Sequence, residues 1–186
     1  MIPILDLWLS IVVAAVLVFV VSSILHMALT YHRRDYKQLP NEAETLEGLR
    51  RGGIPPGFYF FPYAASAKEM GTPEMKEKYR QGPIGILIAR PAGAPTMGKH
   101  LVLWFGYCLL VGIFVAYLAG RTLPAGLEYL EVFRFAGTVA FLAYGLGNIV
   151  NSIWMGVPWG NTLRAVIDGL IYALLTAGTF GWLWPE

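Results

Sequence analysis

The chain has 186 residues, of which 56% are hydrophobic and only 14% are charged, whereas an ordinary soluble domain carries about 25% charged residues. Because the apolar residues are concentrated in long runs, this composition predicts an integral membrane protein. The net charge of +2 and the single cysteine, Cys108, exclude a generally basic nucleic-acid binder, an internal disulfide, a cysteine-only zinc site and an iron–sulfur cluster.

The first apolar run extends from Trp8 to Leu29 and is long enough to cross a membrane as a helix. Asp6 precedes this run, where a signal peptide would have basic residues, and Arg33 and Arg34 follow it. This pattern favours a retained anchor over a cleaved signal peptide. Residues 1–30 are therefore predicted to form the first transmembrane segment.

Residues 31–100 form a polar, 70-residue insert between the first and second apolar runs. Asn41 predicts the start of a short helix, and Thr72 followed by proline predicts the start of another. The apolar stretches 54–63 and 84–90 are predicted to be extended, either pairing as two strands or lying against lipid headgroups. We expect the insert to dock on the inner face of the membrane-spanning helices, since two strands alone are marginally stable.

One segment of the insert nearly matches a phosphate-binding loop. Residues 93–99 have its glycine and lysine spacing, but His100 stands where a magnesium-binding hydroxyl is needed. Pro95 also removes a backbone donor. No nucleotide is therefore expected as a partner.

Residues 101–186 contain three further apolar runs, at 101–120, 133–154 and 162–184. Short turns rich in glycine and proline separate them, so consecutive helices are expected to be antiparallel neighbours. Together with the first run they predict an all-α membrane protein. Its fold is expected to be a four-transmembrane-helix antiparallel bundle, packed as a single domain, with the insert on the cytoplasmic side.

The basic residues predict the orientation, because Lys and Arg near helix ends are retained on the cytoplasmic side of a membrane. Eleven of the fourteen lie between residues 31 and 100. Tryptophan, which favours the membrane–water interface, agrees with this orientation. The predicted outer tryptophans are Trp8, Trp182 and Trp184, and the predicted inner ones are Trp104, Trp154 and Trp159. Both termini are expected outside and the insert in the cytoplasm.

Small residues recur every fourth position along the fourth apolar run. Such a stripe lets two helices approach closely in a bilayer. Packing within this chain is the expected use of the stripe, and a dimer interface is the alternative. The stripe consists of Ala165, Gly169, Ala173, Ala177 and Gly181.

Three helices place polar groups at about the same depth near the cytoplasmic boundary, namely His26, Asn148 and Asp168. Polar and ionisable groups at membrane depth are costly and are candidates for function. Asn151 lies near the same level, and Tyr172 lies one helical turn beyond Asp168. These five residues form the candidate intramembrane polar site.

Two interpretations of this layer remain open. In the first, Asp168 pairs with Arg164, His26 bonds to a serine or a backbone carbonyl, and the asparagines hold helices together. In the second, His26 and Asp168 form a small site that opens to the cytoplasm. No metal or haem site is expected, because His32 and His100 are expected at the surface and no H-x-x-x-H spacing occurs.

Several segments resemble an uncharacterised family of small bacterial four-helix integral membrane proteins with no established activity. The resemblance implies a location in the bacterial inner membrane. It rests on Ser22-Ser23-Ile24-Leu25-His26-Met27, His32-Arg33-Arg34-Asp35-Tyr36, Pro55-Pro56-Gly57, Lys68-Glu69-Met70-Gly71 and the stretch from Asp168 to Trp184.

No complete catalytic set of residues occurs in the sequence, and no cofactor is expected. The first functional hypothesis is a non-enzymatic accessory or assembly component, whose partners are the lipid bilayer and other membrane proteins or copies of the chain. The alternative is a membrane enzyme or transporter that binds a small molecule at His26, Asn148 and Asp168.

Overall fold

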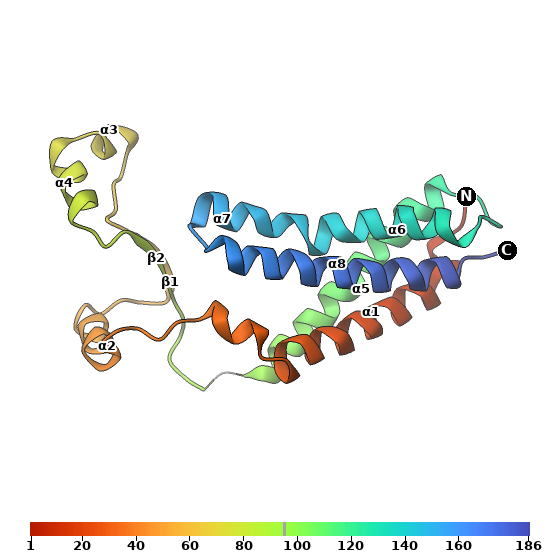
Figure 1. Ribbon diagram of the computed structural model, residues 1–186, viewed down its shortest axis with the longest axis horizontal. Coiled ribbons are helices and arrows are strands. Elements are labelled where there is room, and N and C mark those ends of the chain that lie inside the picture. Colours follow the sequence, from red (N-terminus) through yellow and green to blue (C-terminus); the bar gives the residue numbers. More distant parts are fainter. Residues whose placement is uncertain (95) are drawn as a thin grey trace. The chain divides into compact units, whose positions relative to one another are not determined.

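The computed structural model describes residues 1–94 and 96–186, so that Pro95 of the near-match to a phosphate-binding loop lies outside the described residues. The chain is mostly helical (Figure 1). It divides into two compact units. Unit 1 comprises residues 1–36 and 96–186, and unit 2 comprises residues 37–95.

Unit 1 confirms the four predicted membrane-spanning segments. Within the described residues, four helices are long and apolar enough to span a membrane: Ile4–Ala28, Met97–Thr122, Tyr129–Met155 and Trp159–Trp182. Between 28% and 44% of the most apolar part of each helix is buried inside the chain. Many large apolar side chains of these helices are exposed, and such a surface suits contact with lipid tails.

The first and third spans are not uniform α-helices. The first consists of a 3₁₀ turn at Ile4–Leu7, helix α1 at Trp8–Ser23 and a π turn, η2, at Ile24–Ala28. The third consists of α6 at Tyr129–Tyr144, a 3₁₀ turn at Leu146–Asn148 and α7 at Ile149–Met155. The second and fourth spans are single helices, α5 at Met97–Thr122 and α8 at Trp159–Trp182.

Helices α6 and α8 pack together along most of their length (Figure 1). A Cβ atom added at Gly169 of α8 would overlap the backbone of Gly145, and one added at Gly137 of α6 would lie 3.0 Å from the Cβ of Ala177. The helices therefore approach as closely as glycine allows. This contact also coincides with the break in the third span, since Gly145 separates α6 from the 3₁₀ turn.

Helix α1 packs on α5 and α8, and α5 packs on α6. The backbone amide of Ile2 donates to the carbonyl of Gly120, so the start of the first span lies against the end of α5. The chain termini lie at the same end of unit 1 (Figure 1). Leu7, Val18 and Phe180 are among the completely buried side chains of the core.

After the π turn the chain changes direction within two residues. Leu29 is extended, and a 3₁₀ turn, η3, then covers Tyr31–Asp35. Turn η3 contacts α8. The segment that follows the first span is therefore folded back onto unit 1.

The described part of unit 2 contains three short helices, and Asn41, the residue before the first of them, makes no side-chain capping hydrogen bond. Helix α2 covers Glu42–Arg51, α3 covers Ala67–Met70 and α4 covers Pro73–Gln81. The Thr72 hydroxyl accepts a hydrogen bond from the amide of Met75, as expected of a helix-capping residue.

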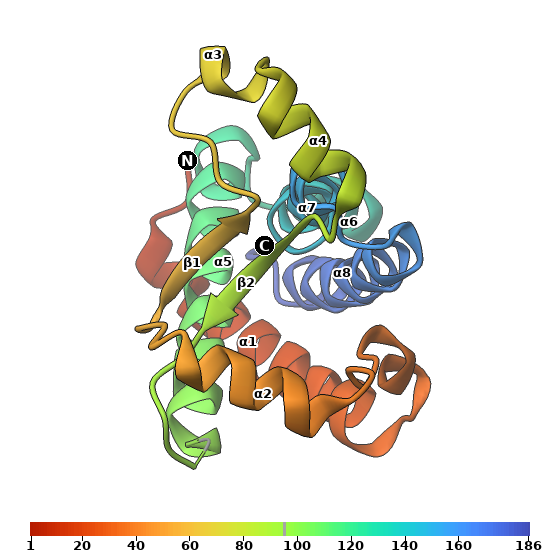
Figure 2. The ribbon, with the colours of Figure 1, turned by 90° about the vertical axis from the view of Figure 1, so that its left-hand side faces the viewer.

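The two apolar stretches of unit 2 pair as strands. Strand β1, Gly57–Phe61, runs antiparallel to β2, Gly85–Ala89, with Tyr59 opposite Leu87 (Figure 2). In this pairing the apolar side chains of Phe58, Phe60 and Ile88 are exposed.

Candidate functional site

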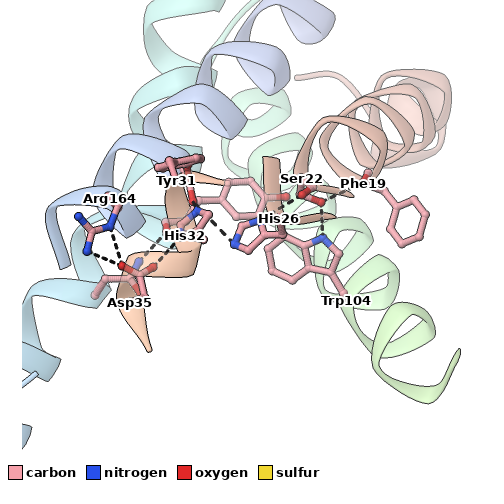
Figure 3. Close-up of polar contacts among 11 residues, drawn as sticks. Phe19, Ser22, His26, Tyr31, His32, Asp35, Trp104 and Arg164 are labelled. Carbon is pink, nitrogen blue, oxygen red and sulfur yellow. Dashed lines mark hydrogen bonds and ion pairs between the residues drawn. The ribbon is translucent and has the colours of Figure 1, made fainter. Parts of the chain in front are cut away.

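The carboxylate of Asp168 contacts three polar side chains in unit 1, those of Tyr31, His32 and His26, which are labelled in Figure 3. Asp168 lies on α8, and its side chain is 5% exposed. Its Oδ1 accepts a hydrogen bond from the hydroxyl of Tyr31. Its Oδ2 lies 2.7 Å from Nε2 of His32 and 3.8 Å from Nε2 of His26. A buried carboxylate is thus surrounded by three polar side chains from the end of the first span and the turn that follows it.

His32 lies between two carboxylates. Its Nε2 faces Asp168, and its Nδ1 lies 2.6 Å from Oδ2 of Asp35. A neutral imidazole offers one N–H donor, and two are available only in the imidazolium form. Two ionised carboxylates on one ring therefore require an additional cation, either a proton or a metal ion.

His26 lies in the π turn and forms a hydrogen bond with the end of α1. Its Nδ1 lies 3.0 Å from the backbone carbonyl of Ser22, so Nδ1 must carry the proton that is donated in this bond. In the neutral ring Nε2 is then unprotonated and faces Asp168. The ring stacks on that of His32, with 4.2 Å between the ring centroids and 14° between the planes.

Arg164 fixes the position of the Asp35 carboxylate. Its Nε lies 2.6 Å from Oδ1 of Asp35, and its NH2 group contacts the same oxygen. The amide of Asn161 donates to the backbone carbonyl of Asp35. Burial disfavours the ionised form of Asp35, but hydrogen bonds from His32 and Arg164 outweigh it and hold the pKa of this carboxyl below the ordinary value for aspartate.

A cavity of about 540 Å³ borders the cluster. Its polar lining residues include His26, Asn148 and Asp168, together with two serines of α1. Its other walls are apolar or aromatic. The lining residues are Ser22, Ser23, His26, Met27, Met97, Leu101, Trp104, Tyr107, Ala143, Tyr144, Gly147, Asn148, Ala165, Asp168 and Tyr172.

The aromatic walls of the cavity are tied to three helices. Trp104 of α5 donates its indole N–H to the Ser22 hydroxyl at 2.7 Å, and the Tyr107 hydroxyl donates to the carbonyl of Ala143 at 2.9 Å. Trp104 also contacts the ring of Tyr172 edge-on, with 5.9 Å between the centroids. These bonds hold the rings in place around the cavity.

The hydroxyl of Tyr172 is buried and has no hydrogen-bond partner among the described residues. Buried polar groups nearly always have a partner. Tyr172 is also one of the residues that line the cavity.

Four of the five residues of the candidate intramembrane polar site line this cavity. They are His26, Asn148, Asp168 and Tyr172. Asn148 donates its side-chain amide to the carbonyls of Tyr144 and Gly145. Asn151 is exposed on α7 and does not line the cavity.

The stripe of small residues on α8 lies partly in the same region. Ala165 lines the cavity. Gly169 and Ala177 pack against α6, and Gly181 lies against the ring of Tyr129 at the start of α6.

Sequence reasoning missed three members of the cluster, Tyr31, His32 and Asp35. His32 was expected at the surface, but its side chain is only 13% exposed. The pairing of Arg164 also differs from the local one considered above, because Arg164 binds Asp35 instead of Asp168. One feature of the sequence could have identified these residues. Residues 31–35, directly after an apolar run, are all polar or ionisable.

Comparisons with protein-family models, curated proteins and solved structures find no match to this chain. Its function must therefore be argued from the geometry of the site.

Proposed function

We propose that this protein binds a small aromatic amphiphile, a molecule with a planar polar ring and an apolar tail, in the cavity of unit 1. The observation that carries the proposal is the cavity itself, about 540 Å³ in volume and lined both by the polar side chains of His26, Asn148 and Asp168 and by aromatic and apolar side chains. Its volume is typical of small-molecule sites, which measure about 300–1,000 Å³.

The walls favour a planar ring. Trp104, Tyr107, Tyr144 and Tyr172 surround the cavity, and aromatic faces and edges pack well against another ring. The unpartnered Tyr172 hydroxyl and the His26 imidazole supply hydrogen bonds for polar substituents of that ring.

The rim favours an apolar tail. Met27 and Met97 line the cavity and are 68% and 58% exposed. Methionine adapts to irregular apolar ligands because its side chain is flexible and polarizable. A tail bound between them would leave the cavity towards the surrounding lipid.

We further propose that the four spans form an antiparallel bundle in a bacterial inner membrane, with both termini outside and residues 37–95 in the cytoplasm. The eleven basic residues between positions 31 and 100 support this orientation. The cavity then opens near the cytoplasmic boundary of the membrane.

Filling the cavity provides the test. A Cβ at Gly147, which lines the cavity, would meet no atom within 4 Å, so Gly147→Leu places a side chain in the cavity without a backbone clash. We expect it to weaken binding of a benzoquinone with a ten-carbon tail, used as the probe, at least tenfold, since the probe and the leucine compete for the same volume. Binding is measured by quenching of tryptophan fluorescence in nanodiscs.

Gly106→Leu is the matched control, because Gly106 is also unobstructed but does not line the cavity. It should leave the affinity unchanged. Tyr172→Phe should weaken binding about five- to tenfold, the effect of one lost hydrogen bond. Equal affinities in the wild-type protein, Gly147→Leu and Tyr172→Phe would overturn the proposal and favour the non-enzymatic accessory role.

A further inference from the structure

We infer that His26, His32 and Asp168 form a binding site for one divalent first-row transition-metal ion. Each residue offers one ligand atom, and these atoms lie within 4.8 Å of one another. Two imidazoles and one carboxylate are a donor set used for both zinc and non-haem iron. The inference goes beyond binding of the amphiphile, since it assigns a cation that the cavity and its aromatic walls do not require.

The distances from Asp168 to the two imidazoles are close to those expected around a shared ion. Two ligand atoms that each lie about 2.1 Å from one ion are about 3.0–3.4 Å apart. The distances from Oδ2 of Asp168 to Nε2 of His32 and of His26, 2.7 and 3.8 Å, lie on either side of this range. Because the two rings lie nearly parallel, with 14° between their planes, a shared ion requires the half-exposed His26 ring to turn as well as approach, so that the Nε2 lone pairs of both rings point at one centre.

Each ligand is held by a further hydrogen bond, as is usual around protein-bound metals. Nδ1 of His32 faces Asp35, and Nδ1 of His26 faces the carbonyl of Ser22. Both Nδ1 atoms therefore act as donors, which leaves the Nε2 lone pairs for a metal. The Tyr31 hydroxyl occupies Oδ1 of Asp168 and leaves Oδ2 as the ligand oxygen.

The charges around His32 also favour a cation. Asp35 and Asp168 are both acidic and Arg164 is the cation paired with this cluster, so the three side chains leave one net negative charge. Uncompensated charge at membrane depth is costly. A divalent ion in place of the proton otherwise needed between His32 and Asp168 changes the net charge of these side chains from −1 to +1, and it also engages His26.

The remaining coordination positions of such an ion face the cavity, because two of its ligands, His26 and Asp168, line it. Three protein ligands with an open position are typical of metal sites that bind a further molecule. The ion would thus lie beside His26 and Asp168 in the wall of the cavity.

The test uses the full chain in nanodiscs after treatment with a chelator. Titration with Co²⁺, followed by its visible absorption, should show saturation at about one ion per chain. His26→Ala and His32→Ala should each weaken binding at least 100-fold. Asp35→Asn, which keeps all three ligands but removes the carboxylate behind His32, should weaken it about 10- to 100-fold.

His100→Ala is the matched control, since it removes a histidine outside the cluster and should not change the Co²⁺ affinity. A measurement on the wild-type protein covers the case in which a variant fails to fold. Pulsed electron paramagnetic resonance of the protein loaded with Cu²⁺ should detect two histidine nitrogens. Absence of saturable binding, a spectrum without two such nitrogens, or an unchanged affinity in folded His26→Ala would overturn the inference.

The experiments test the metal site and the amphiphile site independently of each other. Gly147→Leu should block the quinone and retain Co²⁺ binding, because Gly147 is not a ligand. If the wild-type protein does not bind the quinone, the proposed function is refuted, but the inference of a metal site is not contradicted.

Discussion

At the scale of single residues, Arg164 controls the site without contacting the cavity. It binds Asp35, and Asp35 in turn binds Nδ1 of His32. The orientation of the His32 ring therefore depends on a chain of two polar contacts that begins on α8. Arg164 is a positioning residue, and its role can be separated from those of the residues around the cavity.

We expect Arg164→Met to lower the free energy of unfolding by about 2 kcal/mol, because it leaves the Asp35 carboxylate without its guanidinium partner. The expected loss of stability is smaller than for a fully buried ion pair, because the Arg164 side chain is 25% exposed. The measurement is unfolding by SDS in mixed micelles, combined with Asp35→Asn in a double-mutant cycle. A coupling energy below about 0.5 kcal/mol would contradict the pairing.

His26, Asn148, Asp168 and Tyr172 could be selected from the sequence because each is a polar group within an apolar run. His32 could not be selected in this way. It is six residues from His26, and a regular helix would carry it to a different face. Only the π turn and the reversal at Leu29 bring the two rings into contact.

At the scale of elements, the break in the third span and the stripe of small residues on α8 meet at one contact between helices. Gly145 and Gly169 are in backbone contact, where no Cβ fits at Gly169. The start of α4 at Thr72 was predictable, because a capping residue acts locally, whereas Asn41 precedes α2 without a side-chain capping bond. The break at Gly145 was not, because it depends on a helix that lies beyond it in the chain.

Gly169→Ala should destabilise the protein by about 1–3 kcal/mol, the usual effect of overpacking. Gly178→Ala on the same helix is the matched control, since its Cβ would lie 3.5 Å from the Tyr129 hydroxyl, an ordinary contact. It should be neutral or stabilising by up to about 1 kcal/mol, because alanine favours helix more than glycine does. Unfolding in SDS compares them, and equal stabilities would refute the close approach of α6 and α8.

At the scale of the whole molecule, the proposed orientation is open to a labelling experiment. Cys108 is the single cysteine and is buried, so a Cys108→Ala background accepts one new cysteine at a time. In intact cells, a membrane-impermeant maleimide should label Ala125→Cys, in the connection before α6, and should label Lys76→Cys, in α4, only after permeabilisation. The reverse pattern would invert the orientation.

The polar cluster comes from two short stretches of chain, residues 26–35 and residues 164–168, although it combines six side chains. It therefore reduces to a compact sequence pattern, His-x₄-Tyr-His-x₂-Asp followed in the last apolar run by Arg-x₃-Asp. A protein with four apolar runs and this pattern is expected to have the same site. One that has the runs without the pattern would share the architecture alone.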